Sequence, residues 1–64
     1  MKKFFIVTFS AGNPATNYLK IGIRSVDALS FSQAEEQFNQ IRAEILKDIP
    51  DMIIEILQIA IVNA

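Results

Sequence analysis

The chain contains neither cysteine nor histidine among its 64 residues. Without cysteine there is no disulfide and no thiolate metal site. Without histidine the commonest metal ligand and the commonest acid–base catalyst are both missing, and no Ser–His or Cys–His catalytic pair can form. We therefore expect no catalytic residue, no metal, no cofactor and no enzymatic activity.

A charge excess is also missing, because six basic and seven acidic residues give a net charge of −1. Such a balance provides no field that would attract nucleic acid or a membrane surface. The absence of cysteine fits the reducing cytoplasm, where we expect the protein to act.

Long hydrophobic runs are absent as well. Lys2 and Lys3 precede an apolar stretch as they would in a secretory signal, but the stretch Phe4 to Phe9 is interrupted by Thr8 and is shorter than the usual core of about 7 to 15 residues. Residues 52–64 fall short of the roughly 20 apolar residues that a membrane span needs. We expect neither a signal peptide nor a membrane segment.

What the chain does have is a high hydrophobic fraction, 52%, against a usual range of about 45–50%. A domain of this size buries only about 60% of its unfolded surface. We expect a single domain, residues 1–64, that compensates with a good core or with self-association.

Two strands are predicted in the first half. Residues 3–10 are β-branched and aromatic, and both of their faces are largely apolar, which is typical of a central strand. Residues 18–26 alternate between an apolar side with Leu19, Ile21 and Ile23 and a more polar side, as in an edge strand. Residues 11–17, AGNPATN, are predicted to form a protruding loop, and they lack the GK[ST] ending of a phosphate-binding loop.

A helix is predicted over residues 30–47. Ser30 with Gln33 forms one possible N-cap, and Ser32 with Glu35 forms the other. Pro50 ends the helix. The apolar stripe at 3-4-3-4 spacing consists of Phe31, Ala34, Phe38, Ile41 and Ile45.

The last apolar segment, residues 53–62, has two interpretations. A helix would place Glu55 and Gln58 on one side. A strand is favoured, because β-branched side chains are stiff in a helix. Plain alternation would then place Ile53, Glu55, Leu57, Ile59 and Ile61 on one face and Ile54, Ile56, Gln58, Ala60 and Val62 on the other.

The predicted fold is α+β: a ββαβ two-layer sandwich with a three-stranded antiparallel sheet in the order 2-1-3 and one helix on one face. The sequence does not say which sheet face meets the helix. One helix covers only one face, so apolar side chains of strands 1 and 3 would stay exposed, while strand 2 would keep a polar second face. We therefore expect a homodimer or higher oligomer, formed sheet on sheet or by edge-to-edge addition of strand 3.

Glu55 interrupts an apolar strand. If it is buried, it needs a basic partner across the sheet, for which the candidates are Lys2, Lys3, Lys20 and Arg24. If it is exposed, it is a charge at a frayed end of the strand or part of an interface salt bridge. Its substitution would test a third function class, a small enzyme or a subunit that completes another enzyme's site.

One surface is favoured for binding another protein. Tyr18, Lys20 and Arg24 share a strand face, and the neighbouring loop adds Asn13 and Asn17. Basic residues interleaved with an aromatic residue also suit single-stranded nucleic acid, so a nucleic-acid-binding protein is the alternative. The slightly acidic composition argues against it.

The stretch RSVDALSFSQAEEQF, a strand leading into a capped helix and then a last strand, resembles small phage-encoded ββαβ proteins. The resemblance implies a non-enzymatic inhibitor that binds and blocks a host protein. It is a likeness of pattern only, and no functional residue follows from it.

Overall fold

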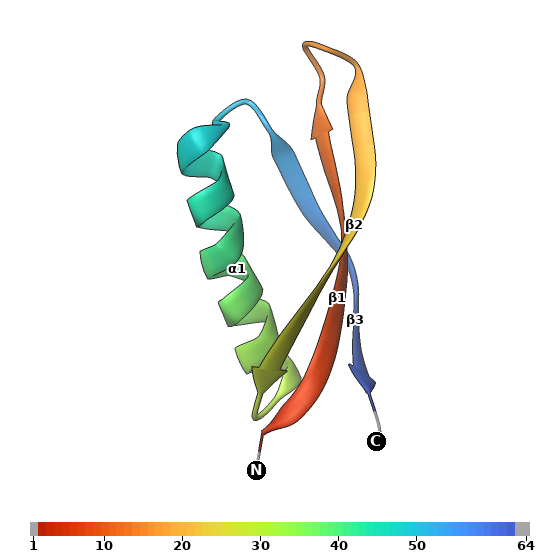
Figure 1. Ribbon diagram of the computed structural model, residues 1–64, viewed down its shortest axis with the longest axis vertical. Coiled ribbons are helices and arrows are strands. Elements are labelled where there is room, and N and C mark those ends of the chain that lie inside the picture. Colours follow the sequence, from red (N-terminus) through yellow and green to blue (C-terminus); the bar gives the residue numbers. More distant parts are fainter. Residues whose placement is uncertain (1, 63–64) are drawn as a thin grey trace.

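The computed structural model describes residues 2–62. The elements follow in the order β1 (Lys3–Asn13), β2 (Tyr18–Ala28), α1 (Phe31–Asp48) and β3 (Ile53–Val62). The strands form a three-stranded sheet in the order β2-β1-β3, with both pairs antiparallel. The predicted α+β class, element order and strand order are therefore confirmed. Figure 1 shows α1 lying along one face of the sheet, and no other helix or strand formed by residues 2–62 lies on the opposite face.

The hairpin between β1 and β2 is longer, and its loop shorter, than predicted. Ala11, Gly12 and Asn13 pair with β2 instead of belonging to a loop. The chain can turn within residues 14–17 because Asn13 stabilises the turn: its Oδ1 accepts a hydrogen bond from the Ala15 N–H at 3.0 Å. Asn17 adopts the left-handed conformation, with φ 59°, which asparagine tolerates better than most residues.

Residues 53–62 form a strand, as favoured, but the predicted division of its side chains is wrong. Thr8 pairs with Gln58 whereas the next residue, Phe9, pairs with Ile56, so Leu57 is the extra residue of a β-bulge. A bulge reverses the alternation after it. Ile54 and Ile56 before it, and Ile59 and Ile61 after it, therefore all belong to the core on the helix side.

The core lies between α1 and the sheet. Phe5, Val7 and Phe38 are the largest fully buried side chains, at most 1% exposed. The Phe38 ring lies 5.0 Å from the Phe9 ring, and Phe31 meets Phe5 edge-on at the same distance. Burial of such side chains contributes about 1.5–3 kcal/mol each. The predicted helix stripe is confirmed in its middle, with Ala34 and Phe38 buried.

Two polar contacts hold α1 diagonally across the sheet. Gln37 donates from Nε2 to the Asp27 carbonyl at 2.8 Å, at the end of β2. Arg42 donates from Nη1 to the Ile54 carbonyl at 3.2 Å, near the start of β3. The helix therefore covers the C-terminal end of β2 and leaves the hairpin end of that strand open.

The helix begins at the first of the two predicted caps. Ser30 Oγ accepts a hydrogen bond from the Gln33 N–H at 3.2 Å, and Gln33 Oε1 accepts one from the Leu29 N–H at 2.6 Å. Ser32 lies inside the first turn. At the other end α1 stops at Asp48, two residues before Pro50.

We predict that Ser30→Ala lowers the free energy of unfolding by about 1 kcal/mol, because it removes the acceptor for an N-terminal amide. Ser32→Ala is the matched control and should change it by less than about 0.5 kcal/mol. Urea denaturation followed by circular dichroism measures both. Equal losses in the two variants would contradict the cap assignment.

Candidate functional site

The first candidate surface is the rear face, which we define as the side of the sheet turned away from α1. Six large apolar side chains on this face are 40–74% exposed. The strand register places them on the side of the sheet opposite the buried residues Phe5 and Val7. They are Phe4, Leu19, Ile21, Ile23, Ile53 and Val62.

The expectation that strand 2 keeps a polar face away from the helix is wrong. Val26 and Ala28 are buried in the core on the helix side. Because alternate residues share a face, Lys20, Gly22 and Arg24 also lie on that side. Leu19, Ile21 and Ile23 consequently belong to the rear face, which is more apolar than the sequence predicted.

The exposed apolar area of this surface lies at the upper end of the range found on isolated monomers. With about 150–200 Å² for a fully exposed large apolar side chain, the six residues leave roughly 600 Å² of rear face in solvent. The radius of gyration of 12.6 Å exceeds the roughly 10.7 Å expected for a compact chain of this length. Residues 2–62 form an elongated two-layer structure with an open apolar side.

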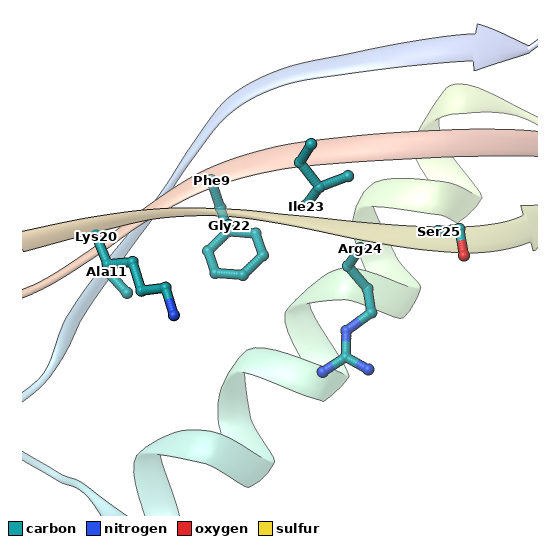
Figure 2. Close-up of a pocket in the computed structure, with 7 residues that line it drawn as sticks. All are labelled: Phe9, Ala11, Lys20, Gly22, Ile23, Arg24 and Ser25. Atoms are coloured by element: carbon teal, nitrogen blue, oxygen red, sulfur yellow. The ribbon is translucent and has the colours of Figure 1, made fainter.

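The second candidate surface is a basic hollow of about 380 Å³ between β1 and β2, lined by Phe9, Ala11, Lys20, Gly22 and Arg24 with Ile23 and Ser25. Figure 2 shows the Lys20 and Arg24 side chains extending on the same side of the strands as the Phe9 ring, whereas Ile23 points the other way. The only ion pair among residues 2–62 joins Lys47 and Glu44, so neither cation of the hollow has a carboxylate partner there.

Gly22 makes this hollow possible. It is the cross-strand partner of Phe9, and a Cβ at this position would lie 2.5 Å from the Phe9 Cζ atom. The ring thus occupies the space that a side chain would fill. The glycine also leaves this face of β2 without a side chain between Lys20 and Arg24.

The five residues predicted to bind a partner divide into two groups. Tyr18, Lys20 and Arg24 share one strand face, as the alternation indicated. Asn13 and Asn17 shape the hairpin turn, which accounts for both residues without a ligand.

Glu55 is exposed on the rear face, opposite Ser10. It lines a second hollow of about 260 Å³ near the hairpin turn, together with Leu19 and Ile53. The pairing with a basic residue, suggested for a buried Glu55, does not arise, because Glu55 is exposed and Lys20 and Arg24 lie on the opposite face. The alternative that Glu55 lies on an exposed surface agrees with its position.

Among residues 2–62, no three acidic side chains gather closely enough to hold a metal ion. In the same range no helix has the length and hydropathy to cross a membrane. Comparisons with family models, curated proteins and solved structures found no match to this chain.

Sequence reasoning missed the rear position of Leu19, Ile21 and Ile23, and it missed the contact between Phe9 and Gly22. The rear position of these three residues was signalled by Val26 and Ala28. These two small apolar residues lie at even-numbered positions of the strand, as Lys20 and Arg24 do, so all four share one face. The contact between Phe9 and Gly22 follows from the hairpin register. That register can be assigned only when the loop is known to span residues 14–17.

We predict that Gly22→Ala lowers the free energy of unfolding by about 1–3 kcal/mol, because the new methyl group overlaps the Phe9 ring. The same substitution in a Phe9→Leu background should cost clearly less, although Phe9→Leu is itself destabilising. A double-mutant cycle from urea denaturation measures the coupling. Additive effects would contradict this explanation of Gly22.

Proposed function

We propose that the protein is a non-enzymatic protein-interaction module that works as a homodimer, with the rear faces of two copies packed sheet on sheet. The observation that supports this proposal is the exposed apolar rear face. Its roughly 600 Å² approaches the ~800 Å² per partner of a standard interface, and it reaches the upper range of the largest patch on a typical monomer, about 300–600 Å².

Six large apolar side chains lie on the rear face, and covering about 600 Å² contributes on the order of 15 kcal/mol before the costs of association. A small domain has a total stability of only about 5–15 kcal/mol. A second copy supplies a surface of matching composition, because a two-fold interface uses the same patch on both subunits.

Sheet-on-sheet packing leaves the helix side free. In this arrangement the dimer is a scaffold that presents two copies of Tyr18, Lys20 and Arg24 on its outer surfaces. Binding another protein there would occlude that protein's own contacts, which is how we propose the module acts. Inhibition of a host protein by a phage-encoded chain is one form of such activity.

Nucleic-acid binding is the weaker candidate. The basic hollow combines two cations with an aromatic ring, but the chain as a whole has a net charge of −1. Proteins that bind single strands through stacking usually also provide a positively charged groove. Two cations supply little of such a groove.

We predict a mass of twice 7.2 kDa in sedimentation equilibrium at micromolar concentration. Ile21→Lys, on the rear face, should raise the dimer dissociation constant by about thirtyfold or more, since burying an unpaired ammonium group at an interface centre costs at least about 2 kcal/mol. Ile21 is 55% exposed in the protomer, so the isolated fold should tolerate the change.

Ile49→Lys is the matched control, because Ile49 is also exposed but lies at the C-cap of α1 and belongs to no strand. It should leave the dissociation constant unchanged within about twofold. A monomer at micromolar concentration, or an oligomer unaffected by Ile21→Lys, would overturn the proposed dimer.

A further inference from the structure

Among residues 2–62, no strand pairs with the outer edge of β2. In the sheet order β2-β1-β3, β2 pairs with β1 alone. Half of its backbone N–H and C=O groups therefore point away from the sheet, which is the arrangement that accepts an added strand. The dimer proposed above covers the rear face and leaves this edge accessible.

The side chains along this edge specify a charge. Lys20, Gly22 and Arg24 occupy alternate positions on the helix side, so the two cations are separated by one open position over the Phe9 ring. In Figure 2 both basic groups extend beside the hollow. Directly opposite side chains of neighbouring strands lie about 4.5–5.5 Å apart, near enough for opposite charges to attract.

A second copy does not suit this edge. If two β2 strands paired antiparallel about Gly22, Lys20 of each would lie opposite Arg24 of the other. Like charges directly opposite each other destabilise a strand pair. The edge is thus closed to self-pairing in that register and complementary to an acidic strand.

We propose that β2 binds an extended acidic segment of another protein as an added strand. Acidic side chains at alternate positions would meet Lys20 and Arg24, and a small apolar side chain between them would enter the hollow over Phe9 beside Gly22. This inference rests on the proposed function, because it assumes that the module binds another protein.

The test uses a synthetic peptide in which every second residue is threonine and the residues between are glutamate, valine and glutamate, in that order. In an antiparallel pairing with β2 these three lie opposite Arg24, Gly22 and Lys20. Titration into isotope-labelled protein should shift the amide resonances of residues 18–26. The Lys20→Glu, Arg24→Glu double variant should weaken binding about tenfold, because each exposed pair contributes up to about 1 kcal/mol.

Three controls separate strand addition from general attraction. Lys47→Glu makes the same kind of charge change at an exposed helical position and should weaken binding by less than about twofold. A peptide with glutamine in place of glutamate should bind more weakly, and a peptide N-methylated along its pairing edge should not bind.

The inference is overturned if shifts at β2 are absent, if Lys47→Glu weakens binding as much as the double variant, or if the N-methylated peptide binds equally well. It is also overturned if single-stranded oligonucleotide, but not the acidic peptide, shifts the same resonances. Sedimentation of the same samples measures dimerisation independently. A protein that dimerises but does not bind the peptide would therefore refute this inference and leave the proposed dimer intact.

Discussion

The packing of α1 against one face of the sheet is the interaction on which the structure depends. Phe38 enters the sheet's buried side next to Phe9, and Phe5 and Val7 complete the same layer. A single helix can shelter only one face of a sheet. The helix crosses the sheet diagonally, because Gln37 is bound at the C-terminal end of β2 and Arg42 at the start of β3. Even the covered face therefore stays open along the hairpin end of β2.

Two local features decide which side chains lie on each face. Val26 and Ala28 insert under the helix and thereby turn Lys20 and Arg24 to the helix side and Leu19, Ile21 and Ile23 to the rear. The bulge at Leu57 keeps four isoleucines of β3 in the core. Together they produce one mostly apolar face and one partly basic face. The proposed dimer is based on the first of these surfaces and the proposed peptide site on the second.

The sequence predicted much of this architecture. The β-branched composition of residues 53–62 correctly favoured a strand, and the Ser30–Gln33 cap and Pro50 bounded the helix. The faces of β2 and β3 were less predictable, because alternation shows which residues belong together but not which set meets the helix. A single bulged residue reverses that pattern and leaves no composition signal. Tyr18, Lys20 and Arg24 were grouped correctly, since they lie within one regular stretch of strand.

The most direct test of the central claim is an isotope-filtered nuclear Overhauser experiment on a mixture of labelled and unlabelled protein. We predict intermolecular contacts from the methyl groups of Ile21 and Ile23 to other rear-face side chains, with none from Ala34 in the core. A mixture without intermolecular contacts at those methyl groups, or with contacts confined to α1, would contradict the claim that a second copy covers the rear face.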